Sequence, residues 1–159
     1  MFRVFVGIRP LLAGVCACGG MLLGCSSDDP PAEPRCLAAP GPLDCNGSYG
    51  YDPATDSLQP TFAEAYRFTF KPRCASPGCH SGGSPAGGLQ LQSENEAFDS
   101  LHANGSNGIP RVTGGDISCG MVIVRIETHG EEWSMPRGTQ LSDPDLCSVR
   151  HWINNGAER

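Results

Sequence analysis

The sequence lacks an apolar run long enough to cross a membrane. The longest, from Leu11 to Gly24, covers only 14 residues, whereas a membrane-spanning helix needs about 20. Arg3 and Arg9 precede this run, and positive charge followed by a short apolar stretch is typical of a secretory signal peptide. We therefore expect residues 1–24 to direct export, which would place the rest of the chain outside the cytoplasm.

Positive charge and aromatic residues are also scarce. The chain has 11 Lys and Arg against 17 Asp and Glu, and its formal net charge is −6. A nucleic-acid-binding domain needs a basic face, so this balance argues against nucleic acid as a partner. Aromatic residues make up only 7% of the chain. The supply of apolar residues allows one core but is thin, so cross-links or a large apolar cofactor would help to stabilise the fold.

Cysteine, by contrast, is abundant, with nine in the chain. Cys16 and Cys18 would leave with the signal peptide, and Cys25 follows it directly. An even set of cysteines in an oxidising compartment favours disulfides, although their pairing cannot be deduced from sequence. Beyond Cys25 the set comprises Cys36, Cys45, Cys74, Cys79, Cys119 and Cys147.

Two disulfides are suggested by the position of these cysteines in the chain. Cys36 and Cys45 lie in segment 25–58, which is rich in Pro, Gly, Ser and Asp and which we interpret as a tether. We expect them to close a loop within it. Cys119 and Cys147 fall on two expected helices of a domain at 59–159, and we expect them to form the second bond. A zinc site there would need two further ligands that the sequence does not supply.

The domain at 59–159 carries the start signals of short helices. Thr61 and Glu64 form a capping box that predicts a helix over residues 61–70, and Pro72 predicts its end. Ser93 and Glu96 form a second capping box before another short helix.

Two further helices are predicted towards the C-terminus. Asp116 could cap "ISCGMVIVRIE", although its Val-Ile-Val core could equally form a short strand. Ser142 begins the last helix, with Pro144 in its first turn and Gly156 after its end. The expected fold is therefore all-α, a small domain of three to four short helices joined by glycine-rich loops.

The stretch "CASPGCHSGG" carries the candidate chemistry. Cys-x-x-Cys-His is the signature of covalent c-type haem attachment, but here four residues separate Cys74 from Cys79 before His80. Pro77 and Gly78 could fold the extra residues into a tight turn beside a haem. The same turn could equally bring the two cysteines together as a disulfide, so both interpretations stay open.

A haem iron held by His80 would need a second axial ligand, and Met135 in "EEWSMPRG" is the candidate. Methionine opposite histidine is typical of electron-transfer haems because it raises the reduction potential. Gly130 and Gly138 bracket this loop and would let it bend over a flat ligand. His129 is the rival ligand, whereas Met121 in the expected third helix is interpreted as a core residue.

The order of motifs from Thr61 to Ala157 resembles the small cytochrome c-like domains of exported bacterial proteins. The matching stretches are "CASPGCHSGG", "SPAGGLQL", "VTGGDIS", "WSMPRG" and "HWINNGA". The resemblance implies haem c as the cofactor, thioether bonds from Cys74 and Cys79, and iron ligation by His80 and Met135. It implies an electron carrier with a redox partner protein, and not an enzyme.

The sequence "LLGCSS" around Cys25 resembles a bacterial lipobox. The resemblance implies cleavage before Cys25, a lipid on that cysteine and, from Ser26, retention in the outer membrane. A membrane-anchored electron carrier is thus the first hypothesis. The second is a haem-free binding or structural lipoprotein stapled by disulfides, including Cys74–Cys79. A peroxidase-like enzyme would require that Met135 does not bind the iron.

Overall fold

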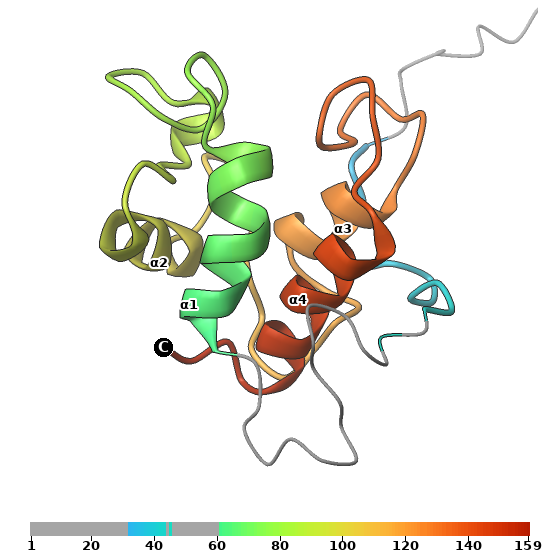
Figure 1. The fold of residues 1–159 in the computed structure, drawn as a ribbon. Coiled ribbons are helices and arrows are strands. Elements are labelled where there is room, and N and C mark those ends of the chain that lie inside the picture. The colour runs from blue at the N-terminus through green and yellow to red at the C-terminus, as the bar shows by residue number, and fades with distance from the viewer. Residues whose placement is uncertain (1–31, 44, 46–60) are drawn as a thin grey trace, which may run out of the picture. The chain divides into compact units, whose positions relative to one another are not determined.

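The computed structural model describes residues 32–43, 45 and 61–159, so the expected signal peptide, Cys25 and most of the expected tether lie outside it. The described residues form helices and isolated bridges but no strand, which confirms the all-α class. None of these helices is long and apolar enough to cross a membrane. In chain order the elements are α1 (Phe62–Ala65), the π-helix η2 (Tyr66–Cys74), the 3-10 turn η3 (Ala86–Gly88), α2 (Glu94–His102), α3 (Met121–Glu127) and α4 (Asp143–Asn154) (Figure 1).

The first helix begins as predicted but ends later than expected. The backbone N–H of Thr61 donates to the Glu64 carboxylate at 2.8 Å, which is half of the capping box. After α1 the chain continues without a break into η2, which runs through Pro72 to Cys74. The N–H of Ala75 bonds the carbonyl of Phe70 at 3.0 Å. This i to i+5 bond is the π-helical pattern, and the helical backbone continues past Pro72.

Helix α4 also begins and ends where the sequence predicts. Its N-cap Ser142 accepts from the N–H of Asp145, Pro144 lies in the first turn, and Gly156 follows the helix with a φ of 93°. Trp152 on this helix is buried against the first helix, with its ring centroid 5.0 Å from that of Phe62. Figure 1 shows α1 and α4 side by side at the centre of the domain.

The second helix begins after its predicted N-cap, Ser93, whereas the third starts later than expected. In α2 the N–H of Glu96 donates to Ser93 Oγ. Helix α3 is a helix rather than a strand, but its N-cap is Gly120. Asp116 instead accepts from the N–H of Ser118 at 2.8 Å in a local turn. This turn satisfies the carboxylate before the helix starts, because Asp can bond its own neighbouring backbone as readily as a helix end.

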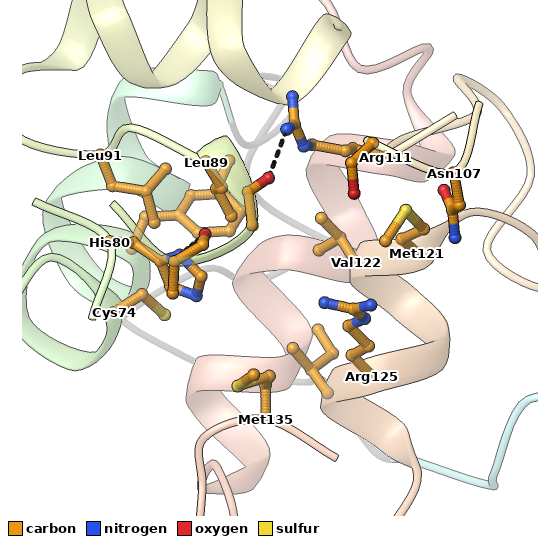
Figure 2. Close-up of a pocket in the computed structure, with 15 residues that line it drawn as sticks. Cys74, His80, Leu89, Leu91, Asn107, Arg111, Met121, Val122, Arg125 and Met135 are labelled. Carbon is orange, nitrogen blue, oxygen red and sulfur yellow. Dashed lines mark hydrogen bonds between the residues drawn. The ribbon is translucent and has the colours of Figure 1, made fainter. Parts of the chain in front are cut away.

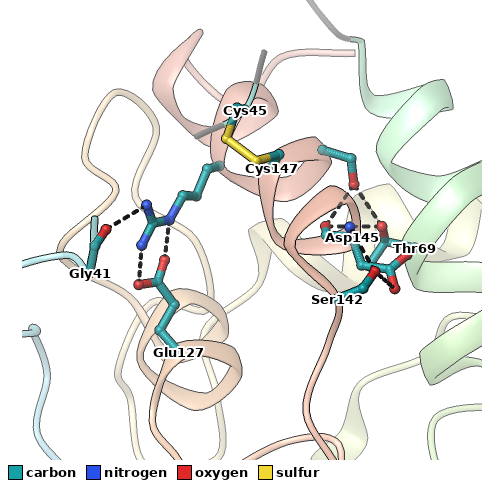
Figure 3. The surroundings of a disulfide bond; sticks show 9 residues. Gly41, Cys45, Thr69, Glu127, Ser142, Asp145 and Cys147 are labelled. Atoms are coloured by element: carbon teal, nitrogen blue, oxygen red, sulfur yellow. Dashed lines mark hydrogen bonds and ion pairs between the residues drawn. A yellow bond between two sulfur atoms is a disulfide. The ribbon is translucent and has the colours of Figure 1, made fainter. Parts of the chain in front are cut away.

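The disulfide pairing differs from the prediction. All four expected cysteines are bonded, but Cys36 joins Cys119. Cys45 joins Cys147 (Figure 3). The reason is that residues 32–43 fold back onto the domain. The N–H of Leu37 bonds the carbonyl of Ser118 at 2.7 Å, so Cys36 lies opposite Cys119.

Arg150 also holds this N-terminal segment, residues 32–43 and 45, in place. Arg150 of α4 forms a two-bond ion pair with Glu127 at the end of α3. The same guanidinium donates to the carbonyl of Gly41 at 2.9 Å (Figure 3). Part of the segment that we interpreted as a tether is therefore fastened to both α3 and α4.

We expect non-reducing peptide mapping to recover Cys36 linked to Cys119 and Cys45 linked to Cys147. The first bond joins cysteines 83 residues apart in the sequence, and the second joins cysteines 102 residues apart. Replacing Cys45 and Cys147 together by Ser should therefore lower the free energy of unfolding by about 2–5 kcal/mol, measured by denaturant titration. Peptides linking Cys36 to Cys45 or Cys119 to Cys147 would contradict this fold.

Candidate functional site

One pocket gathers three of the four residues predicted to hold a cofactor: Cys74, His80 and Met135. Its cavity volume is about 120 Å³, below the roughly 300–1,000 Å³ typical of small-molecule sites. Figure 2 shows Cys74 and His80 on one side, Val122 and Arg125 of α3 opposite, and Met135 near the bottom. Most of the wall is apolar and includes Phe70, Leu89, Leu91, Val122 and Ile126.

The imidazole of His80 is held in one tautomer. Its Nδ1 lies 3.1 Å from the carbonyl oxygen of Ala86 in η3. Since a carbonyl can only accept, Nδ1 must carry the proton, and Nε2 keeps its lone pair in the neutral ring. Burial lowers the pKa of His80, and the cations Arg125 and Arg111 contribute to the shift. His80 is therefore a neutral imidazole at neutral pH, which is the form that binds metals.

The two motif cysteines are the free cysteines of the described chain. Cys74, the last residue of η2, is half-buried at the pocket wall, whereas Cys79 is exposed. Burial, followed by the charge of Asp145, raises the pKa of the Cys74 thiol to about 12. At neutral pH Cys74 is thus a protonated thiol that reacts slowly by itself.

Met135 is held at the pocket by its own backbone. Its N–H bonds the carbonyl of Arg125 in α3 at 2.8 Å, which ties the loop to that helix. A tight turn precedes it, where the N–H of Ser134 bonds the carbonyl of Glu131. The thioether side chain lines the pocket together with Cys74 and His80.

Met121 also lines this pocket, which corrects its interpretation as a pure core residue. It is half-buried at the start of α3, and a Cβ at Gly105 would collide with its sulfur. Figure 2 shows Met121 beside Asn107, away from His80 and Cys74. A second soft sulfur is therefore available in the pocket, on the wall opposite the motif.

Two arginines line the pocket that the sequence did not mark as functional, Arg111 and Arg125. Arg125 pairs with Glu33 through two bonds of 2.6 and 2.7 Å. Arg111 is buried and donates to the backbone carbonyls of Ser100 and Gly87 at 2.7 and 2.9 Å. Nothing in the local pattern distinguishes Arg111 from a solvated arginine, because its burial depends on residues far away in the chain.

The other histidines lie away from the pocket. His129, the predicted rival ligand, lines a second hollow formed by the loop around residues 129–140, together with Arg137. His102 ends α2, and His151 lies on α4. Across residues 32–43, 45 and 61–159, no three His, Cys, Asp or Glu residues come together in a way that could hold a metal ion.

No protein-family profile matches this chain, and no curated protein or solved structure is significantly similar to it. The interpretation of the pocket therefore rests on its own geometry and chemistry.

The motif cysteines should differ in reactivity in haem-free protein. At pH 8 we expect iodoacetamide to label Cys79 at least about tenfold faster than Cys74, because Cys74 is buried and hardly ionised. Mass spectrometry of the peptides measures both rates. Equal rates would contradict the burial of Cys74, and labelling of either cysteine only after reduction would reveal a Cys74–Cys79 disulfide.

Proposed function

We propose that this chain is a membrane-anchored, extracytoplasmic mono-haem c-type cytochrome that passes on single electrons. The observation that supports it is the set of groups at one apolar pocket: the neutral imidazole of His80, the thioether of Met135 and the thiol of Cys74. The remaining cysteines of residues 32–159 that are described form disulfides, which leaves Cys74 and Cys79 available for a cofactor.

The donor set suits a low-spin haem iron better than a zinc ion. Zinc prefers three or four thiolate, imidazole or carboxylate ligands, and the described residues contain no such cluster. One imidazole and one thioether are the pair found in electron-transfer haems. In this proposal His80 would bind through Nε2, oriented by the bond from Nδ1 to Ala86, and Met135 would bind through its sulfur.

Attachment would use the thiols of Cys74 and Cys79. Each S–H adds across one vinyl double bond of the haem: one S–C bond forms, the hydrogen goes to the neighbouring carbon, and no oxidant or reductant is consumed. Because burial keeps Cys74 protonated, we expect the exporting cell to supply an attachment enzyme. The four-residue spacing would loop out at Pro77 and Gly78, where the backbone turns with a φ of 83° at Gly78.

When bound, the haem iron supplies one-electron redox chemistry. The chain would contribute two axial ligands and an apolar wall that excludes water. With both axial positions taken, the protein would be an electron carrier for a partner protein, not an enzyme. Lipid on Cys25 would hold it at the outer membrane, with the segment after it as the link to the domain.

The second candidate is a haem-free lipoprotein of the same fold, acting as a binding or structural module. The observation in its favour is that two long-range disulfides already cross-link the domain without any cofactor. In that case Cys74 and Cys79 would bond to each other.

Covalent haem is the decisive test. In a host with haem-attachment machinery, the intact mass should exceed that of the apoprotein by one haem, and the denatured protein should stain for haem after electrophoresis. Replacing both Cys74 and Cys79 by Ser should abolish the stain. A wild-type mass below the reduced apoprotein by only the hydrogens of three disulfides would support the haem-free alternative.

Met135→Ala should remove the sulfur–iron absorption band of the oxidised protein, lower the reduction potential and open the iron to small ligands. The reason is that the soft thioether favours ferrous iron and fills the sixth position. Met121→Leu is the matched control, since Met121 lines the same pocket, and it should leave all three properties unchanged. If Met121→Leu alone removes the band, Met121 is the ligand instead.

A further inference from the structure

Arg111 is a buried cation without a counter-charge. Arg111 is only 8% exposed to solvent, yet no Asp or Glu of the described residues lies within ion-pair distance of its guanidinium. Its bonds go to uncharged backbone carbonyls, those of Ser100, Ala103 and Gly87. The charged group that acts on it is Arg125, a second cation. Burying an unpaired charge is strongly unfavourable, so such a group calls for an anion.

Arg125 provides the contrast within the same pocket. Its guanidinium is neutralised by Glu33 of the N-terminal segment through two bonds. Two cations therefore line the pocket, but only Arg111 brings a charge that no carboxylate of the described residues balances. The remaining wall is largely apolar, and the half-buried His80 imidazole is neutral.

We propose that Arg111 is the anion-recognition residue of this pocket and binds a carboxylate carried by an otherwise flat, apolar ligand. This inference rests on the proposed function for one identification: in a haem, the carboxylate is a propionate. The recognition itself needs neither iron nor thioether bonds. It follows from a buried guanidinium at the edge of an apolar cavity, which matches an amphiphilic acid.

The turn η3 fixes where this charge lies relative to His80. Two consecutive backbone carbonyls of the turn accept hydrogen bonds from different side chains. The carbonyl of Ala86 accepts from His80, and the carbonyl of Gly87 accepts from Arg111. Gly87 and Gly88 have φ values of 61° and 65°, a conformation that only glycine adopts without strain. One short turn thus sets the spacing between the imidazole and the guanidinium, and so between a ligand's centre and its acidic edge.

Metal-free protoporphyrin and its dimethyl ester test the proposal. The probes share a ring, but only the first has free carboxylates, and neither contains iron. The full chain, exported in a host without haem-attachment machinery, would be titrated with each probe and followed by fluorescence. We expect the wild type to bind the acid about tenfold or more tightly than the ester, the range expected for a charged hydrogen bond.

Arg111→Gln should lose the preference for the acid while still binding the ester, and Arg137→Gln should keep it because Arg137 lines the other hollow. Arg111→Lys retains the charge and should retain part of the preference. Circular dichroism and thermal melting verify that each variant folds. If Arg111→Gln does not fold, the preference for the acid is compared between Arg111→Lys and the wild type instead.

The proposal is overturned if the wild type binds neither probe, binds both equally, or if the preference survives in Arg111→Gln or disappears in Arg137→Gln. Its failure is separable from that of the proposed function. A chain that never acquires covalent haem but shows an Arg111-dependent preference for the acid would refute the cytochrome and uphold the recognition site. A chain that acquires covalent haem but shows no such preference would support the cytochrome and refute the recognition site.

Discussion

The contact between the first and last helices is the interaction on which the rest of the domain depends. Trp152 of α4 packs against both Phe62 and Phe70, with ring centroids 5.0 and 5.8 Å away. A polar contact continues this interface, since Thr69 Oγ1 lies 2.6 Å from Ser148 Oγ. Because Phe70 and Cys74 lie further along the same helix as Phe62, this packing sets the position of one pocket wall.

The opposite wall is fixed by different means. Helix α3 has only seven residues, too few to be stable alone. It is held by the disulfide at Cys119, the pairing of Glu127 with Arg150 and the pairing of Arg125 with Glu33. The pocket therefore lies between a wall made by aromatic packing and a wall made by covalent and ionic links. A protein with few aromatic residues can in this way keep a pocket open between two separately fixed walls.

The features that the sequence predicted correctly are local. Thr61, Ser93 and Ser142 act on backbone groups within one helical turn, so their side chains and spacing suffice to place helix starts. Beyond these local features, the structure places Cys74, His80 and Met135 at one pocket, whereas their roles as haem-binding residues stay a prediction.

What the sequence did not predict depends on distant partners. The pairing of Cys36 with Cys119 follows from the fold-back of residues 32–43, which has no local signal. Met121 could be placed on a helix but not on one of its faces, and the burial of Arg111 needs the carbonyls of Ser100 and Gly87. The Asp116 carboxylate could accept from the start of the helix or from a local turn, and in the structure it accepts from the N–H of Ser118 in the turn.

The bond between Cys36 and Cys119 has a mechanical consequence. It is the first cross-link that the described chain meets from its N-terminal side. A pull on the chain ahead of Cys36 passes through the two sulfurs into the backbone at the start of α3. The polypeptide between these cysteines does not transmit this force. It includes all of η2 and the turn at His80. Tension from an anchor would thus be borne by covalent bonds, and the motif wall of the pocket would be shielded from it.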